Sequence, residues 1–290
     1  MHRRSSRSLL LVLTTATSIV CAGCSPSRIV VDKPVVDSVG SDSVLVEQVF
    51  PTADQIPENL LRFYIYFSTP MRPDVARHSI RLADQHGNTI DDAFLETGAG
   101  LWSNDRQRLT VLLNPGRVKA GLGASDSMGL AIQAGNHYAL IIDANATAYD
   151  GSTVAEPYHK WFSVTEADRE SPRPERWTLS RPNRDTRDPL VVALDGPADH
   201  ASLAFRVRVI DGAGGVVRGQ LELGHNEQRW MLTPEEPWAN GAYSLRVEHE
   251  LEDLAGNRPG RLFEHRAGLE FEDTVYLLPI SMSPPAPSHP

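Results

Sequence analysis

The residues best equipped for chemistry are the clustered carboxylates of residues 248–253, which read Glu-His-Glu-Leu-Glu-Asp. On a strand, Glu248, Glu250 and Glu252 would share one face, with Asp253 at the turn that follows. Calcium takes about six to eight oxygen ligands, so such a cluster at a sandwich loop could hold this cation. We favour the alternative, a solvated strand face whose charges oppose edge-to-edge pairing, because no Asp-x-Asp spacing accompanies the run.

Familiar catalytic motifs are absent from the sequence. It contains no Gly-x-Ser-x-Gly elbow, no His-Glu-x-x-His pair, no Walker loop and no Gly-x-Gly-x-x-Gly after a strand. The histidines are scattered without metal-ligand spacing: His78, His86, His137, His159, His200, His225, His249 and His265. We therefore expect a protein that is not an enzyme and that holds neither a metal nor a cofactor.

A second candidate site is the glycine-rich segment 114–133. Loops longer than about 12 residues are uncommon in compact domains and are often functional. The segment contains Arg117, Lys119 and Met128, which we predict to form an interaction loop that meets a partner. The alternative is a loop packed only on its own domain.

The tryptophans raise glycan binding as an alternative function, since an exposed aromatic ring can stack on a sugar. Trp230 alternates with Leu232, which predicts a core position, and Trp177 and Trp238 lie at strand starts or turns, where tryptophan usually packs. The full set is Trp102, Trp161, Trp177, Trp230 and Trp238.

The N-terminus has the composition of an export signal. Three arginines precede a short apolar run over residues 9–20, which suits a secretory signal and falls short of the about 20 apolar residues of a membrane-spanning helix. The following Ala22-Gly23-Cys24 resembles the lipobox of bacterial lipoproteins, although Cys21 stands where that pattern usually has an aliphatic residue.

The lipobox resemblance implies cleavage before Cys24 and a lipid anchor, including palmitate, on that residue. The lipid bilayer is then a partner, and the mature chain has no free thiol because Cys21 leaves with the signal. Ser25 follows the cysteine in place of Asp, so we expect the outer membrane or the cell surface rather than the inner membrane.

The charge balance argues against nucleic acid as a partner, because binding to its phosphates requires a basic surface. The chain has 28 Lys and Arg against 37 Asp and Glu, a net charge of −9. Removal of residues 1–23 takes three arginines and no acid, which leaves 25 basic against 37 acidic residues and a net charge of −12.

The remaining sequence predicts an all-β fold that must position these residues. From Val44 onward, short runs of period two are separated by Gly, Pro, Asn and Asp. Phe63, Ile65 and Phe67 share one face of a strand, and Tyr64 and Tyr66 share the other. We expect no amphipathic helix longer than two turns.

An internal repeat divides this part into two copies. A shift of 127 places Phe63–Glu96 on Leu190–Leu223 without a gap, and shifts of 121 and 105 align the later strands. The shrinking shift means that the first copy carries insertions, the longer one within segment 114–133. Tyr138 and Tyr243 open matching strands and predict tyrosine corners, in which the hydroxyl bonds back to upstream backbone.

Two motifs carry a resemblance to a known domain family. Phe67-Ser68-Thr69-Pro70-Met71 resembles the early-strand signature of bacterial Ig-like domains of the S-layer-protein (SbsA-like) kind, and Glu252-Asp253-Leu254-Ala255-Gly256-Asn257 is similar to their late turn. The whole arrangement resembles uncharacterised bacterial lipoproteins with two such domains. The resemblance implies tandem Ig-like antiparallel β-sandwiches with structural, adhesive or spacer roles, and no chemistry. A fibronectin-III-like sandwich is the alternative.

The predicted organisation places the two sandwiches behind a signal peptide and a flexible tether. A charged segment with two prolines separates the copies and predicts a short, semi-stiff linker. The boundaries are 1–23 signal peptide, 24–43 tether, 44–166 first Ig-like domain, 167–176 linker, 177–272 second Ig-like domain and 273–290 Pro-rich tail.

These observations favour a membrane-anchored envelope lipoprotein that serves as a structural or protein-interaction module, with an envelope protein as its partner. The alternatives are a glycan-dependent or calcium-dependent surface-binding module and, less favoured, an accessory subunit of an enzyme. Carboxylates converging on a large pocket would favour the enzyme, and flat sandwiches would favour the interaction module.

Overall fold

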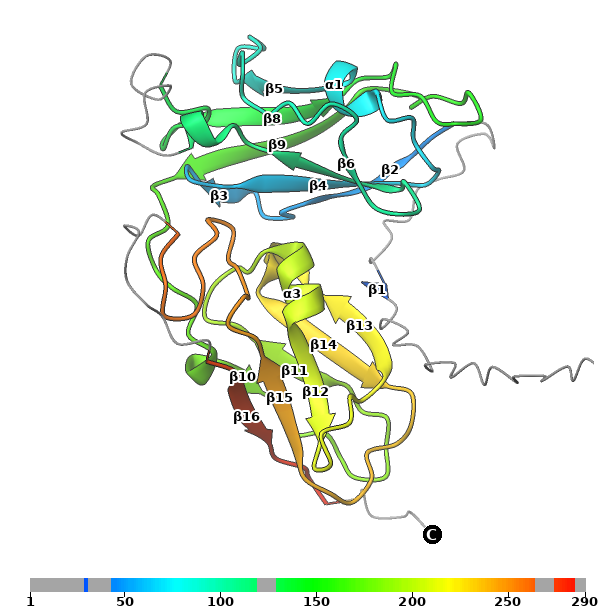
Figure 1. Ribbon diagram of the computed structural model, residues 1–290, viewed down its shortest axis with the longest axis vertical. Coiled ribbons are helices and arrows are strands. Elements are labelled where there is room, and N and C mark those ends of the chain that lie inside the picture. The colour runs from blue at the N-terminus through cyan, green and yellow to red at the C-terminus, as the bar shows by residue number, and fades with distance from the viewer. Residues whose placement is uncertain (1–28, 31–42, 119–128, 264–273, 285–290) are drawn as a thin grey trace, which may run out of the picture.

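The chain forms two stacked β-sandwiches in a computed structural model (Figure 1). The structure describes residues 29–30, 43–118, 129–263 and 274–284. The first sandwich is the upper body of Figure 1 and the second is the lower body, with the short helix α3 between them.

The first sandwich packs two four-stranded sheets face to face. One has the order β2-β4-β7-β6 and the other the order β3-β9-β8-β5. The helical pieces α1 (Val75–His78) and η1 (Pro115–Arg117) lie in its loops. The strands are β2 (Val46–Phe50), β3 (Gln55–Pro57), β4 (Arg62–Phe67), β5 (Ile80–Asp84), β6 (Leu101–Trp102), β7 (Arg108–Leu112), β8 (His137–Ile142) and β9 (Tyr158–Thr165).

The second sandwich repeats this plan with sheets ordered β1-β13-β14-β11-β10 and β12-β15-β16. Apart from β1 and from β3, which pairs in parallel with β9, both sandwiches have the ABED and CFG strand order of constant-type immunoglobulin domains. Its helical pieces are η2 (Pro174–Arg176), α3 (His200–Arg206) and η3 (His225–Glu227). The strands are β1 (Ile29–Val30), β10 (Thr178–Leu179), β11 (Leu190–Ala193), β12 (Val207–Asp211), β13 (Gly219–Leu223), β14 (Arg229–Pro234), β15 (Tyr243–Val247) and β16 (Tyr276–Ile280).

Strand registers confirm the internal repeat. Phe63 pairs with Val111 across β4 and β7, and the residues at shifts of 127 and 121, Leu190 and Leu232, pair across β11 and β14. The other sheets agree in the same way, because the pairs Ile80–Ile142 and Asp84–Tyr138 match Val207–Val247 and Asp211–Tyr243. The low-identity alignment is therefore also the structural alignment.

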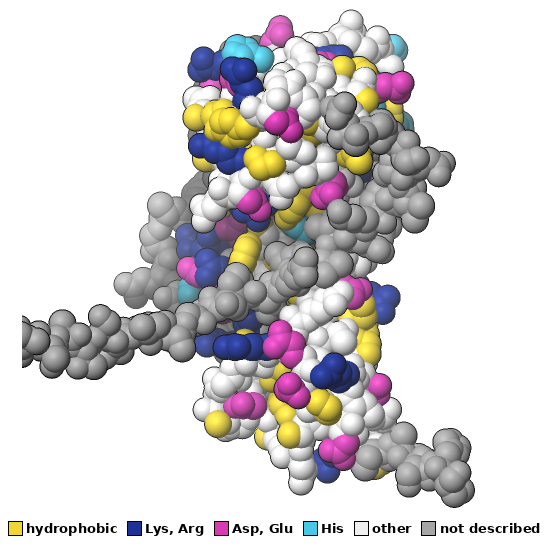
Figure 2. Space-filling model, turned by 90° about the vertical axis from the view of Figure 1, so that its right-hand side faces the viewer, with side chains coloured by type: hydrophobic (Ala, Val, Ile, Leu, Met, Phe, Trp, Pro, Cys, Tyr) yellow, Lys and Arg dark blue, Asp and Glu magenta, His cyan; other side chains and the backbone are white. Residues whose placement is uncertain are grey.

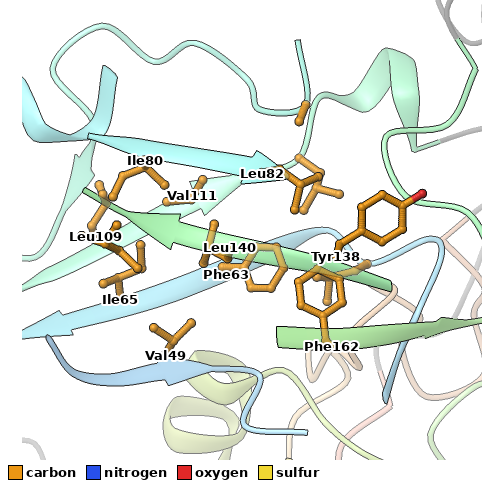
Figure 3. Packing of buried hydrophobic residues seen from close by; sticks show 14 of the residues in the cluster. Val49, Phe63, Ile65, Ile80, Leu82, Leu109, Val111, Tyr138, Leu140 and Phe162 are labelled. Carbon is orange, nitrogen blue, oxygen red and sulfur yellow. The ribbon is translucent and has the colours of Figure 1, made fainter. Parts of the chain in front are cut away.

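The alternation within β4 sets the first core. Phe63 and Ile65 are fully buried and Phe67 is 1% exposed. Phe63 and Ile65 lie with Leu109 of the neighbouring strand and with Leu140 and Phe162 of the facing sheet (Figure 3). The second core gathers around Trp230, which is 2% exposed as its alternation predicted.

Both tyrosine corners are confirmed. The Tyr138 hydroxyl accepts a hydrogen bond of 3.2 Å from the Gln133 backbone N–H, and the Tyr243 hydroxyl donates one of 3.4 Å to the Ala239 carbonyl. Each bond joins the start of a strand to the backbone just before it, so each tyrosine fixes the corner that leads into its strand.

Two predicted boundaries need correction. The second sandwich does not end at residue 272, because β16 pairs with β15 and lies within the segment 273–290 expected to be a Pro-rich tail. Pro279 is tolerated there because β16 is an edge strand. The predicted tether, 24–43, contains β1, which pairs in parallel with β13 of the second sandwich.

Candidate functional site

Tyr64 and Tyr66 point away from the first core, and the second sandwich covers them. The outer face of β2 and β4 receives α3, the turn at η3 and the loop after β15, and we call this contact the joint. Tyr64 is 4% exposed. Two large aromatic residues at outward positions of one strand, Tyr64 and Tyr66, are the sequence signal of the joint.

His200 lies at the centre of the joint and is 2% exposed. Its ring stacks on Phe50 with centroids 3.6 Å apart, and its Nε2 lies 2.9 Å from the Tyr66 hydroxyl. Burial, with a smaller effect of the Arg108 guanidinium, lowers the pKa of His200 to about 3. The joint is therefore built for a neutral imidazole.

An ionic cluster lies beside this histidine. The Tyr64 hydroxyl donates to Asp199, with both carboxylate oxygens at 2.9 Å, and the same carboxylate caps α3 by accepting from the Ser202 N–H at 2.9 Å. Arg62 pairs with Asp199 at 3.6 Å and also with Glu252. Burial raises the pKa of Asp199, and the Arg62 guanidinium opposes that effect.

Glu227 clamps the first sandwich at Thr52. Its Oε1 accepts from the Thr52 N–H at 2.9 Å and from the Thr52 hydroxyl at 2.7 Å. The Asn226 N–H donates to the same hydroxyl at 2.8 Å, and Lys160 donates to the Thr52 carbonyl at 3.1 Å. Burial raises the pKa of Glu227 to about 7. Its φ of 51° costs about 1–2 kcal/mol for a non-glycine residue, which these bonds offset.

Apolar and linker contacts complete the joint. Leu254 of the second sandwich packs into the core cluster of the first, and its carbonyl accepts from the Leu61 N–H at 3.1 Å. In the linker, the Asp168 carbonyl accepts from the amides of Asn59 at 2.8 Å and Asn257 at 3.2 Å. The linker is thus bonded to both sandwiches.

The acidic run 248–253 does not lie on a strand, because β15 ends at Val247. Both interpretations of the run are therefore wrong about its backbone. Glu248 and Glu250 pair with Arg206 of α3, and Glu252 pairs with Arg62 and Arg258. Arginines therefore neutralise the carboxylates that the calcium interpretation required. Within the described ranges, no group of three His, Cys, Asp or Glu side chains is arranged to hold a metal ion.

The interaction-loop prediction is wrong for Arg117, which is 8% exposed. Its Nε donates to the Gly129 carbonyl at 3.1 Å, and its guanidinium also reaches the carbonyls of Asp91 and Leu130. Arg117 thus closes its own loop instead of facing a partner. The other predicted site residues, Lys119, Met128 and Cys24, lie outside the described residues.

A hollow of about 360 Å³ lies along one side of the joint. Asp199, Glu250 and Glu252 converge on it, but each is ion-paired with an arginine of the same hollow, Arg62, Arg206 or Arg258. Two of the carboxylates, Asp199 and Glu252, pair with Arg62 across the joint, whereas Glu250 pairs with Arg206 within the second sandwich.

The tryptophans divide into buried and exposed residues. Trp230 and Trp238 are 2% and 1% exposed, and Trp177 donates its indole N–H to Asp195 at 2.9 Å. Trp161 is 54% exposed on the outer face of β9, where it stacks beside His159. Trp161 is the observation that keeps glycan binding open as an alternative.

The surface carries both signs of charge. On the face seen in Figure 2, Lys and Arg side chains are interspersed with Asp and Glu on both sandwiches, without a continuous basic band. Among the described residues, no helix has the length and apolar character needed to cross a membrane.

No protein-family model matches the chain, and no curated protein matches its sequence. Among solved structures it is similar to native alpha-2-macroglobulin from Escherichia coli spanning domains MG0-NIE-MG1, at 12% identity and a TM-score of 0.28 over 83% of this chain and 72% of that one.

Two further structures have Ig-type or surface-layer descriptions. The S-layer protein rSbsC(31-844) has 13% identity and a TM-score of 0.30 over 71% of this chain and 23% of its own. The N-terminal four Ig domains of Dscam1 isoform 6.9 have 12% identity and a TM-score of 0.27 over 86% of this chain and 53% of theirs. The strand order of the two sandwiches is what makes this chain Ig-like.

Proposed function

We propose that this chain is an exported bacterial lipoprotein, anchored through Cys24, whose two Ig-like domains form one rigid structural and protein-interaction module of the cell envelope. Its place is the outer membrane or the cell surface. The observation that supports the module most directly is the joint, because its hydrogen bonds, ion pairs and apolar contacts hold two sandwiches in one orientation.

The chemistry of the described residues supports a role in binding rather than in catalysis. The buried titratable groups of the joint, Asp199, His200 and Glu227, are each bonded across the two sandwiches. A catalytic acid or base must exchange a proton with a substrate atom within hydrogen-bond reach. The side-chain atoms of these three residues are instead hydrogen-bonded to groups of the first sandwich. We therefore assign them to architecture and propose that the protein is not an enzyme.

The anchor is tested by metabolic labelling with palmitate in cells that express the chain or its Cys24→Ser variant. We expect label and membrane association in the parent and neither in the variant. Label that persists in the variant would overturn the anchor. The module is tested by formaldehyde crosslinking of intact cells followed by affinity purification, and the absence of any adduct would contradict an interaction role.

A further inference from the structure

The two sandwiches have the same loop end, built from the loops that follow β4, precede β7 and follow β8 in the first copy. In the first sandwich, Met71 N–H donates to the Arg106 carbonyl at 3.0 Å, and the equivalent bond in the second runs from Ala198 to Glu227, also at 3.0 Å. Likewise the Arg72 backbone N–H donates to the Thr147 carbonyl at 3.0 Å, and the Asp199 backbone N–H donates to the Glu252 carbonyl at 2.8 Å. The backbones of the two ends are therefore equivalent.

The end of the second sandwich is buried in the joint. Asp199 is 4% exposed, Glu227 is fully buried and Leu254 is 5% exposed, and each contacts the first sandwich. This end is thus a surface that binds the outer face of another sandwich. It contributes two carboxylates and one apolar side chain.

The end of the first sandwich presents different side chains at these positions, and we call it the free loop end. At shifts of 127, 121 and 105, the equivalents of Asp199, Glu227 and Leu254 are Arg72, Arg106 and Tyr149. Tyr149 is 57% exposed, and the Arg72 side chain is 54% exposed. The backbone is retained, whereas the sign of the charge is reversed at two positions and an aromatic ring occupies the third.

Arg106 shares with Glu227 an unusual backbone, with φ of 57° and 51°. In the second sandwich the side chain at this position makes the Thr52 clamp. In the first, the Arg106 guanidinium lies 5.6 Å from the centre of the exposed Tyr149 ring. Arginine and tyrosine are the residue types that dominate binding energy in protein interfaces.

The acids at this end leave the guanidinium groups available. Asp105 accepts from Ser103 and the Gln107 N–H, and Asp150 accepts from the N–H and hydroxyl of Ser152. Asp74 pairs with one nitrogen of Arg72 at 3.3 Å. A guanidinium has five N–H donors, so Arg72 can still hold a carboxylate of a partner.

We propose that the free loop end of the first sandwich binds an acidic face of a separate envelope protein, with Tyr149 as the aromatic anchor and with Arg72 and Arg106 pairing to carboxylates. This proposal rests on the interaction role proposed above and specifies its surface and the chemistry of its partner.

A second copy of this chain fits the free loop end less well. At a shift of 127 from the joint residues Arg62, Tyr64 and Tyr66, the second sandwich carries Pro189, Val191 and Ala193. That face offers none of the aromatic and charged side chains that receive a loop end in the joint. The exposed Arg229 lies on the neighbouring strand and would oppose two further arginines.

The test is site-specific photocrosslinking of the full chain in intact cells. The photoreactive amino acid p-benzoylphenylalanine replaces Tyr149 in one strain and Trp161 in a matched strain, since Trp161 is 54% exposed on a different face of the same sandwich. We expect an adduct from position 149 whose partner peptide is rich in Asp and Glu, and at least a tenfold lower yield of an adduct from position 161.

Charge variants test the role of the arginines. Arg72→Glu with Arg106→Glu should lower the position-149 adduct at least tenfold, whereas Arg72→Lys with Arg106→Lys should retain a larger part of it. Equal unfolding midpoints of the variants and the parent establish that the sandwich is intact.

Each other result overturns the proposal in a distinct way. An adduct that maps to this chain's own sequence would make the occupant a second copy. Adducts from position 161 but not from 149 would move the interaction to another face and leave the proposed function standing. If formaldehyde yields adducts in the same cells but neither photoreactive position does, the free loop end is excluded. If formaldehyde also yields none, the interaction role itself fails.

Discussion

The loop ends of the two sandwiches share a backbone and differ in their surroundings. In the second sandwich the end is covered by the first sandwich, and its side chains are Asp199, Glu227 and Leu254. In the first sandwich the matching end carries Arg72, Arg106 and Tyr149 and faces outward. The same backbone hydrogen bonds fix the three loops in both sandwiches. For example, the bond from the Arg72 N–H is 3.0 Å long, and the equivalent bond from the Asp199 N–H is 2.8 Å long.

Each loop end has two roles, one in building its own sandwich and one in binding another surface. The backbone bonds and the buried turns build the sandwich, because they recur in both copies. The side chains at the three positions determine what the end binds, because they differ while the fold does not. Substitutions at matched positions of the two copies therefore measure how much the joint contributes to stability, with the free loop end of the first sandwich as the reference.

The largest expected difference is between Leu254→Ala and Tyr149→Ala. Leu254 is buried in the core cluster of the other sandwich, so its truncation should lower the free energy of unfolding by about 3 kcal/mol. Tyr149 is 57% exposed, and its loss should cost less than about 0.5 kcal/mol. Urea unfolding of the two variants measures both values. If both variants lose the same free energy of unfolding, burial of Leu254 in the joint adds no stability.

The second difference concerns pH, because His200 occupies the position that Pro73 holds in the first sandwich. The pKa of His200 falls from 6.5 to about 3 in the folded chain, so its contribution to stability is present above pH 6.5 and is lost as the pH falls. Between pH 6.5 and 5 the loss is about 2 kcal/mol, since one pH unit corresponds to about 1.4 kcal/mol.

The measurement compares urea unfolding at pH 6.5 and 5 for the parent chain and for His200→Gln. Glu227 acts in the opposite direction, because its pKa is raised from 4.5 to about 7 and its contribution is lost as the pH rises through 7. Glu227 is present in both proteins, so its contribution cancels in the comparison. Parent and variant should differ in slope, and identical slopes would show that His200 titrates normally.

The third pair is Glu227→Ala and Arg106→Ala. Loss of Glu227 leaves the Thr52 N–H and hydroxyl without their buried acceptor, at a cost of about 1–3 kcal/mol. Arg106 is half-exposed, and its replacement should change stability by no more than about 0.5 kcal/mol. Thermal unfolding at pH 6, below the raised pKa of Glu227, provides the comparison, and a more harmful Arg106 change would refute the assignment of Glu227 as a clamp.

The smallest difference is expected between Gly256→Ala and Gly151→Ala. Both glycines have a positive φ, of 79° and 89°, so both substitutions carry a backbone cost of about 1 kcal/mol. A Cβ at Gly256 would lie 2.4 Å from Leu61 of the other sandwich, whereas a Cβ at Gly151 has nothing within 4 Å. Gly256→Ala should therefore be the more destabilising change in urea unfolding, and the reverse order would contradict the packing of the joint.

Alternation and the repeat were enough to predict the architecture. Inward positions such as Phe63 and Ile65 were readable because a strand places every second residue on the same face. The pairing of β5 with β8 came from the structure, and the shifts of 127 and 105 carry it onto the pairing of β12 with β15. Tyr138 and Tyr243 were recognised from their positions at matching strand starts.

The joint could not be predicted in this way. Alternation shows that Tyr64 and Tyr66 point outward, but it does not show whether water or another domain covers them. Arg117 was assigned to an interaction loop because segment 114–133 is long and rich in glycine, but loop length does not show that its guanidinium is held by the carbonyls of Asp91, Gly129 and Leu130. The strand β16 was missed because its Pro279 and the prolines after it resembled a tail.

The joint also determines the order in which the molecule can be completed. Its ion pair between Arg62 and Glu252 links residues 190 positions apart, so it closes only after both sandwiches have formed. During synthesis the first sandwich can fold while residues 200–258 are still missing, with the aromatic rings of Tyr64 and Tyr66 open to solvent. The chain thus passes through a partly folded intermediate whose exposed aromatic face is prone to aggregation. Folding of the second sandwich buries that face.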